Sequence, residues 1–209
     1  AGALGTILLG CIGWKAWMAV AIYLALGSLV TKIGFEQKEL LGIAEARGGK
    51  RGPENVWGSA ATGALIAVLI GLDIGSKDLL LVAFSASFAA KLADTFGSEI
   101  GKRWGTKTFL ITNLRLVPPG TDGGISFEGT LASFAGSLLM TFVFLILSLI
   151  PNSSLGLVVI FSGFLATILE SFIGAVCQNR LNWISNELVN FFQTTFAALF
   201  AFSFACLII

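Results

Sequence analysis

The chain has 209 residues, of which 56% are apolar and 12% are charged, and its formal net charge is +1. This composition is far more apolar than that of a soluble domain, and the small net charge gives no support for binding nucleic acid. There is no His, and the three Cys residues lie too far apart for a zinc site or a disulfide framework. We therefore predict an integral membrane protein, surrounded by membrane lipid.

Apolar runs predict the membrane-spanning helices. Residues 1–13 are apolar but shorter than the roughly 20 residues that cross a bilayer, and the start at Ala1 rather than Met leaves room for a native N-terminal segment. The apolar runs of this chain do not alternate between apolar and polar residues, which favours helices over a β-barrel. We predict an all-α, polytopic transmembrane helical bundle of about six to seven membrane helices, as one domain over residues 1–209. Six longer runs carry this prediction, at residues 16–34, 56–73, 79–97, 126–150, 155–176 and 188–209.

Basic residues predict the orientation of the bundle. Ten of the 13 Lys and Arg residues lie in the segments that follow runs 16–34, 79–97 and 155–176, whereas Lys15 and Lys77 lie on the other side. Short loops rich in Lys and Arg usually stay in the cytosol. We expect the long loops on the cytosolic or stromal side. A purely topological role would explain the basic residues, but not the acidic residues beside them.

Carboxylates gather at the same predicted end of the bundle. Those at one depth repel one another unless a cation lies among them, and oxygen ligands suit Mg²⁺. Glu170 carries the most weight, because it lies within an apolar run. For the others, ion pairs such as Lys91 with Asp94 are an alternative. The full set is Asp94, Glu99, Asp122, Glu128, Glu170 and Glu187. We predict Asp94, Glu99 and Glu170 as metal ligands, and Asp94, Glu128 and Glu170 as catalytic residues.

Polar residues also recur at helical spacing, which places them on single helix faces. Polar faces within a membrane must meet each other or water, so we predict a polar cleft that opens to the cytosol. Ordinary helix packing explains the weaker Ser and Thr seams. The main faces are Ser87, Lys91, Asp94, Ser98 and Lys102; Gly163, Thr167, Glu170, Gly174 and Gln178; and Asn186, Asn190 and Gln193.

A Gly-rich segment, "VPPGTDGGISFEGT" at residues 117–130, leads into the run at 126–150. Glycines let the backbone turn its N–H groups toward one point, and a helix N-terminus binds anions. With basic residues nearby, this segment predicts a nucleotide or phosphate site. The expected residues are Gly120, Thr121, Asp122, Gly123, Gly124 and Gly129, together with Lys102, Arg103 and Lys107.

A second polar cluster, "EARGGKRGPENVWGS" at residues 45–59, contains Lys50 and Arg51 in a flexible run, followed by Asn55. It predicts a second phosphate site, and we assign Lys50, Arg51 and Asn55 to it, with Asn186 and Asn190 from the last predicted helix. A solvated loop that only sets the topology would explain the basic residues equally well.

Four stretches resemble the membrane family of the phytyl phosphate kinase of vitamin E synthesis, in its plant and cyanobacterial branch. They are "EARGGKRGPENVWGSAATGA", "KLADTFGSEIGKRWG", "PPGTDGGISFEGTLAS" and "ESFIGAVCQNRLNWISNELVNF". The second and third also resemble, more distantly, the core of dolichol kinases and other CTP-dependent membrane transferases. That resemblance implies that Lys102, Arg103 and Gly129 serve the nucleotide and that Asp94 and Glu128 serve the metal. The Lys that precedes the EGT-like element in dolichol kinases is missing here, and Lys107 or Arg115 would replace it.

The resemblance implies a single transmembrane kinase domain. It would transfer a phosphoryl group from CTP, or another nucleoside triphosphate, to a prenyl monophosphate such as phytyl or geranylgeranyl phosphate. Mg²⁺ would be the cofactor, and the membrane would be a bacterial plasma, thylakoid or plastid membrane. A cytidylyltransferase acting on a lipid phosphate and an ion-coupled transporter are the competing interpretations. Phe192, Phe196, Phe200 and Phe204 form a stripe that could hold a prenyl tail, although packing or lipid contact explains such a stripe more simply.

Overall fold

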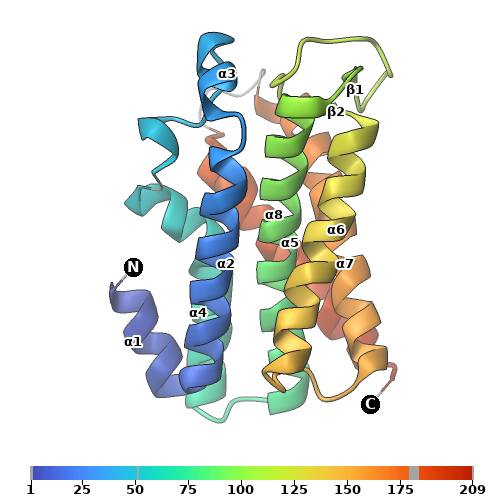
Figure 1. The fold of residues 1–209 in the computed structure, drawn as a ribbon. Coiled ribbons are helices and arrows are strands. Elements are labelled where there is room, and N and C mark those ends of the chain that lie inside the picture. Colours follow the sequence, from blue (N-terminus) through green and yellow to red (C-terminus); the bar gives the residue numbers. More distant parts are fainter. Residues whose placement is uncertain (1, 51, 179–183, 209) are drawn as a thin grey trace.

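The computed structural model describes residues 2–50, 52–178 and 184–208. Long helices run side by side along one axis, with their connections at the two ends (Figure 1). Within the described residues, six helices are long and apolar enough to cross a membrane, which confirms the predicted helical bundle. They are α2 (Trp14–Lys32), α4 (Pro53–Gly71), α5 (Lys77–Trp104), α6 (Phe127–Ile146), α7 (Ser153–Ile173) and α8 (Asn186–Ala205).

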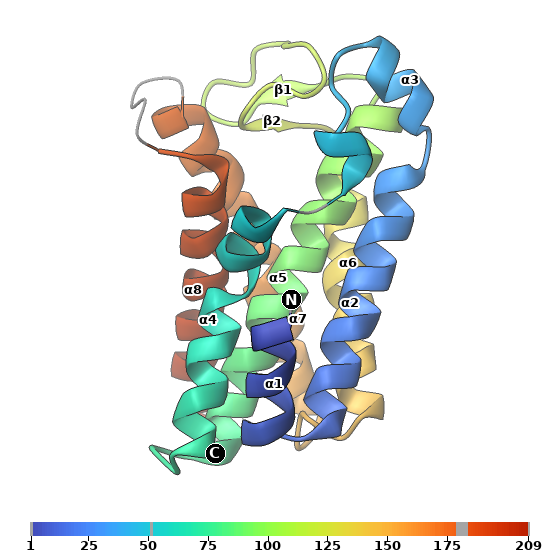
Figure 2. The same ribbon diagram turned by 90° about the vertical axis from the view of Figure 1, so that its left-hand side faces the viewer.

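Shorter elements complete the chain. Helix α1 (Gly2–Cys11) is too short to span a membrane alone, as predicted. It lies against the halves of α2 and α4 that are distant from α3 (Figure 2). The two long polar segments were predicted as loops, but each contains regular structure. The first holds α3 (Phe35–Leu40) and a 3₁₀ turn (Arg47–Gly49). The second holds the antiparallel pair β1 (Phe109–Leu110) and β2 (Gly124–Ile125), and a π-helical turn (Gly174–Gln178) extends α7.

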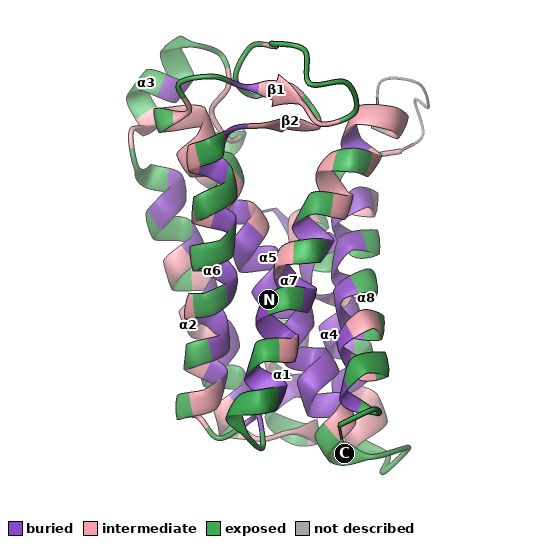
Figure 3. Cartoon of the chain, turned by 90° about the vertical axis from the view of Figure 1, so that its right-hand side faces the viewer, coloured by how far each residue is buried: buried purple, intermediate pink, exposed green. Residues whose placement is uncertain are grey.

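Helix α5 is the centre of the bundle. It contacts all the other long helices, and 83% of its apolar span is buried, against 39–50% for the others. Buried residues line the interior and exposed residues face outward (Figure 3). The run "AFSASFAAKLA" consists mainly of small residues, which allow helix backbones to approach closely in a membrane. Its neighbours can therefore present side chains to a common point.

The helix α5 continues to Trp104, one to two turns beyond the predicted end at residue 97. No proline interrupts the helix before Gly105, and the basic residues of the last turn interact favourably with the helix dipole. Close contact with α6 fixes this extension in place. A Cβ on Gly129 would lie 2.8 Å from the carbonyl oxygen of Gly97, so only glycine fits there. The last turns of α5 and the first turn of α6 are thus locked together.

The polar connections gather at one end of the bundle. Figures 1 and 2 show α3 and the β1–β2 pair together over the ends of α2, α5 and α6. Among the described residues, the opposite end carries short turns at residues 12–13, 72–76 and 147–152 (Figures 1 and 2). The segments rich in Lys and Arg therefore share one end, which we call the loop end.

Candidate functional site

A polar cavity of about 300 Å³ lies at the loop end of the bundle. Helices α4 to α8 and the segment that leads into α6 all contribute to its lining, so the polar cleft expected from the helix faces is present. Most of the predicted site residues meet here. They are Asn55, Asp94, Glu99, Lys102, Gly120, Thr121, Asp122, Gly123, Gly124, Gly129, Glu170, Asn186 and Asn190.

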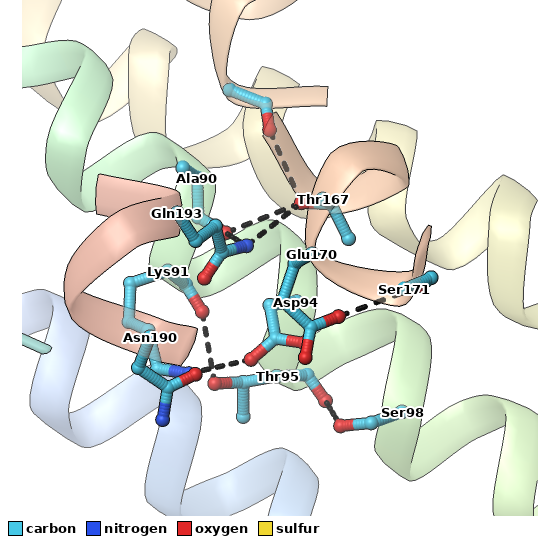
Figure 4. A network of polar contacts seen from close by, with 11 residues as sticks. Ala90, Lys91, Asp94, Thr95, Ser98, Thr167, Glu170, Ser171, Asn190 and Gln193 are labelled. Atoms are coloured by element: carbon cyan, nitrogen blue, oxygen red, sulfur yellow. Dashed lines mark hydrogen bonds and ion pairs between the residues drawn. The ribbon is translucent and has the colours of Figure 1, made fainter. Parts of the chain in front are cut away.

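A buried ion pair lies at the centre of the cavity wall. The Lys91 Nζ donates to Asp94 Oδ2 at 2.5 Å and to Asn190 Oδ1 at 2.8 Å (Figure 4). Lys91 is only 4% exposed. An ammonium group at this depth needs a charged partner and further acceptors. The bond to Asn190 ties α5 to α8, and the bond to Asp94 is the ion pair that the sequence offered as an alternative to a purely metal-binding role.

Glu170 lines the same cavity from α7 and faces the Asp94 region (Figure 4). Its carboxylate accepts a hydrogen bond from the Ser171 hydroxyl at 3.4 Å and lies within electrostatic reach of Asp94, Lys91 and Asp122. Two carboxyl groups therefore line one cavity with the Lys91 ammonium group, which is paired with Asp94. Oxygen ligands of this kind suit a divalent cation such as Mg²⁺.

Glu99 was predicted to form a metal site together with Asp94 and Glu170, but its side chain is paired elsewhere. Its carboxylate forms a buried ion pair with Lys38 of α3, whose side chain is 1% exposed. The Lys38 Nζ also donates to the carbonyl oxygen of Thr31 at 2.9 Å. Within the described parts of the chain, no three His, Cys, Asp or Glu side chains are arranged to hold a metal ion. Glu99 instead attaches α3 to the end of α5.

Glu128 was predicted as a catalytic residue, but it is absent from the described lining of the cavity. Its Oε1 accepts hydrogen bonds from the Thr106 amide at 3.2 Å and from the Thr106 hydroxyl at 2.8 Å. A carboxylate in the first turn of a helix is favoured by the helix dipole, which makes this position structurally reasonable. Glu128 thus connects α6 to the segment after α5.

Four other residues considered from the sequence, Arg103, Lys107, Lys50 and Arg115, also lie outside the described cavity lining. The Arg103 guanidinium stacks over the Trp104 ring at 5.5 Å from its centroid. Lys107 and Lys50 are exposed to solvent, and so is Arg115. Arg51 falls outside the described residues. Lys102 lines the cavity and Arg103 does not, because Lys102 shares the face of Asp94 on α5 whereas the next residue points elsewhere.

The Gly-rich segment closes the cavity beside α7. Gly120 and Gly123 have φ angles of +84° and +72°, which side chains rarely adopt. A Cβ on Gly123 would also lie 2.6 Å from the carbonyl oxygen of Ser171, so the segment packs directly on α7. Ser126 then caps α6 by accepting the Gly129 amide at 3.1 Å. The predicted anion-binding backbone therefore faces the same space as the two carboxylates.

A second hydrogen-bond cluster joins α5, α7 and α8 on the side of the ion pair away from the loop end. The Gln193 Nε2 donates to the Ala90 carbonyl oxygen and to the Thr167 hydroxyl, each at 3.2 Å (Figure 4). Gln193 is fully buried. The polar stripe predicted on α8 thus has two tasks, since Asn190 supports Lys91 and Gln193 joins the helices.

Glu45 and Ser59 also line the cavity and were missed as individual residues, although the polar cluster at 45–59 contains both. Ser59 follows Asn55 by four residues, so the two share one face of α4. That spacing was available in the sequence. No sequence pattern near Glu45 predicts its place in the cavity lining. Its position follows from the contact of Lys38 with Glu99, which are distant in the sequence.

These features define an integral membrane helical bundle with a charged site at one end. The sequence matches the family described as Integral membrane protein DUF92 over residues 1–198, and the chain belongs to that family. It is 52% identical over 136 residues to an uncharacterized membrane protein of Synechocystis, covering 65% of this chain and 53% of that protein.

Two further relatives extend the comparison. Protein VTE6, chloroplastic, of Arabidopsis thaliana is 40% identical over 150 residues, which cover 68% of this chain and 45% of that protein. An uncharacterized membrane protein of Methanocaldococcus jannaschii is 34% identical over 137 residues, covering 66% and 55%. The chain thus spans about half the length of these relatives. The plant and cyanobacterial matches confirm the predicted family resemblance, and no solved structure matches the chain.

The buried Lys38–Glu99 pair generates a prediction about stability. Removing one partner of a buried ion pair costs about 3–5 kcal/mol, because the other charge stays buried. Lys38→Met should lower the free energy of unfolding by about 3 kcal/mol, and adding Glu99→Gln should restore most of it. Chemical denaturation of the purified protein in detergent measures both.

The exposed pair of Arg47 with Glu54, 2.6 Å apart, is the matched control. Exposed ion pairs contribute about 0–1 kcal/mol, so Arg47→Met should have little effect. Equal losses from Lys38→Met and Arg47→Met would contradict the role given to the buried pair.

Proposed function

We propose that this chain forms the catalytic core of a membrane prenyl phosphate kinase. It would transfer the γ-phosphoryl group of CTP, or of another nucleoside triphosphate, to a prenyl monophosphate and yield the diphosphate. The observation that carries the proposal is the cavity at the loop end, in which Asp94, Glu170, Lys91 and Lys102 meet a Gly-rich backbone segment. The relationship to VTE6, with the resemblance described above, supports the choice of substrate.

Phosphoryl transfer between two anionic substrates requires mainly that their negative charge be stabilised. Two anionic substrates must approach each other, and phosphoryl transfer depends on positioning and electrostatics more than on covalent chemistry by the protein. An acceptor phosphate is already ionised near neutral pH. A strong general base is therefore unnecessary, in agreement with a chain that contains no His.

Asp94 and Glu170 are the residues that would hold Mg²⁺. Both side chains line one cavity and offer carboxyl oxygens, so their donor atoms fit the ion. Mg²⁺ usually takes one or two carboxylates and completes its shell with water and substrate phosphates. When bound, it would neutralise phosphate charge during transfer. Lys91 would hold the Asp94 side chain in place through their ion pair.

The remaining cavity residues divide between the two phosphates in this proposal. Lys102 and the backbone of residues 120–124 would hold the donor phosphates, because a cation and N–H groups recognise oxyanions. Asn55, Asn186 and Asn190 lie on the α4 and α8 side and would hold the acceptor phosphate. The Gly-rich segment and the asparagines line one cavity, so both phosphates would be held within it.

The proposal also places the protein in its membrane. The loop end would face the cytosol or stroma, because it carries most of the basic residues. CTP is available there, and the prenyl tail can stay in the bilayer while its phosphate reaches the interface. A plastid, thylakoid or bacterial plasma membrane fits the organisms of the plant and cyanobacterial relatives. A transporter is disfavoured, because its polar groups would run through the whole membrane.

Transfer of label from CTP tests the reaction. The purified protein is given Mg²⁺, geranylgeranyl or phytyl phosphate, and CTP labelled at the α or the γ position. We expect γ label in the lipid product and no α label. Lipid marked by α label would identify a cytidylyltransferase instead, and the absence of both would refute transfer from CTP.

Lys102 and Arg103 provide a matched pair of variants, because adjacent residues of the same charge lie inside and outside the cavity. Charge-assisted hydrogen bonds contribute roughly 1.5–3 kcal/mol. Lys102→Ala should raise the nucleotide KM by about tenfold or more, whereas Arg103→Ala should leave it near wild type. Equal effects from the two variants would argue against a nucleotide contact by Lys102.

Asp94→Asn tests the metal site. The change keeps the volume of the side chain but removes one charge, and it should lower kcat by about a hundredfold to a thousandfold. Excess Mn²⁺ should restore part of the loss. Asp78→Asn, at the exposed opposite end of α5, is the control and should retain activity. If activity falls only together with the melting temperature, Asp94 is only the structural partner of Lys91.

A further inference from the structure

A second cavity of about 460 Å³ lies between α1, α2 and α4, with Phe88 of α5 at its wall. Its lining is mostly apolar, with Leu8, Trp17, Val20 and Leu24 among its members, and no charged residue is among its described lining residues. Helix α1 covers the halves of α2 and α4 away from the loop end (Figure 2). Leu8, Trp17 and Val20 in the lining therefore place the cavity away from the loop end. Ligand pockets in proteins typically have volumes of about 300–1,000 Å³.

The two cavities share a boundary. Asn55 and Ser59, which lie one turn apart on α4, belong to the lining of both. An elongated molecule with a polar head and an apolar tail could therefore occupy both cavities at once. Its head would lie near Lys91 and Asn190, and its tail would run between α1 and α2.

The boundary also contains an unsatisfied polar atom. Ser59 is 4% exposed, and its Oγ has no hydrogen-bond partner within the described residues. A buried hydroxyl without a partner is costly, so such groups usually have an unseen ligand or water. A phosphate oxygen held at this point would accept the Ser59 hydrogen bond, and the neighbouring Asn55 amide could donate to the same group.

We propose that the apolar cavity is the binding site for the prenyl tail of the acceptor, and that Asn55 and Ser59 hold its phosphate at the boundary. This inference rests on the proposed kinase function and names the part of the chain that selects the acceptor lipid. The aromatic stripe on α8 has no part in it. Phe192, Phe196 and Phe204 are 37–47% exposed and lie outside the described lining of either cavity.

Filling the cavity should shift the preference for tail length. Ala21 lines the apolar cavity from α2, so Ala21→Phe would occupy space that a long tail needs. We expect the ratio of kcat/KM for geranylgeranyl phosphate to that for dimethylallyl phosphate to fall by about tenfold. Ala135→Phe introduces the same side chain at an exposed position of α6 and should keep the wild-type ratio. An unchanged ratio in a folded Ala21→Phe protein would overturn the proposal.

A binding experiment makes the test independent of turnover. A prenyl monophosphate with a diazirine at the end of its tail is irradiated with the wild-type protein in nanodiscs, and the labelled peptides are identified by mass spectrometry. We expect labels on α1 and α2 that an excess of unlabelled geranylgeranyl phosphate removes and an excess of phosphatidylglycerol does not. Labels only on the outer faces of α6 to α8, or competition by phosphatidylglycerol, would overturn the proposal.

The same experiment separates the two hypotheses. Labelling of α1 and α2 in a protein that transfers no phosphate would support the tail site and refute the kinase. Phosphate transfer without labelling there would support the kinase and refute the tail site.

Discussion

The structure depends on one constraint, which is that a charge within a membrane protein must be neutralised by other parts of the protein. Lys91 satisfies it through Asp94 on the same helix and Asn190 on α8. These contacts draw α5 and α8 together at one depth and leave Glu170 of α7 facing the same space. Lys91 thus supports both the packing of α5 against α8 and the charge of the site.

Helix α5 can occupy the centre of the bundle because its neighbouring helices pack closely against it. Without a strong hydrophobic force between helices in lipid, association relies on van der Waals contact and hydrogen bonds. The contact of Gly97 with Gly129 brings the end of α5 against the start of α6. That contact sets the position of Lys102 relative to the Gly-rich segment. A side chain at either glycine would separate the two parts of the proposed donor site.

The loop end is organised by contacts between residues that are distant in the sequence. The Lys38–Glu99 pair holds α3 on α5, and the bond from Thr106 to Glu128 holds the following segment on α6. Both carboxylates were predicted to act in chemistry, and both act in assembly within this structure. An acidic side chain near a cavity is therefore weak evidence for catalysis until its partner is known.

Hydropathy by itself determined the membrane class and the six long helices, because a helix in lipid must satisfy its own backbone and needs about 20 apolar residues. Helical spacing also placed Asp94 and Lys102 on one face and predicted the polar cleft. Only the tertiary structure decided which carboxylates meet, since Glu99 finds Lys38 across 61 residues and Glu170 finds the Lys91–Asp94 pair from another helix. It alone also joined the apolar cavity to the polar site at Asn55 and Ser59. Spacing along one helix cannot reveal such pairings, because they depend on how neighbouring helices are rotated and how closely they pack.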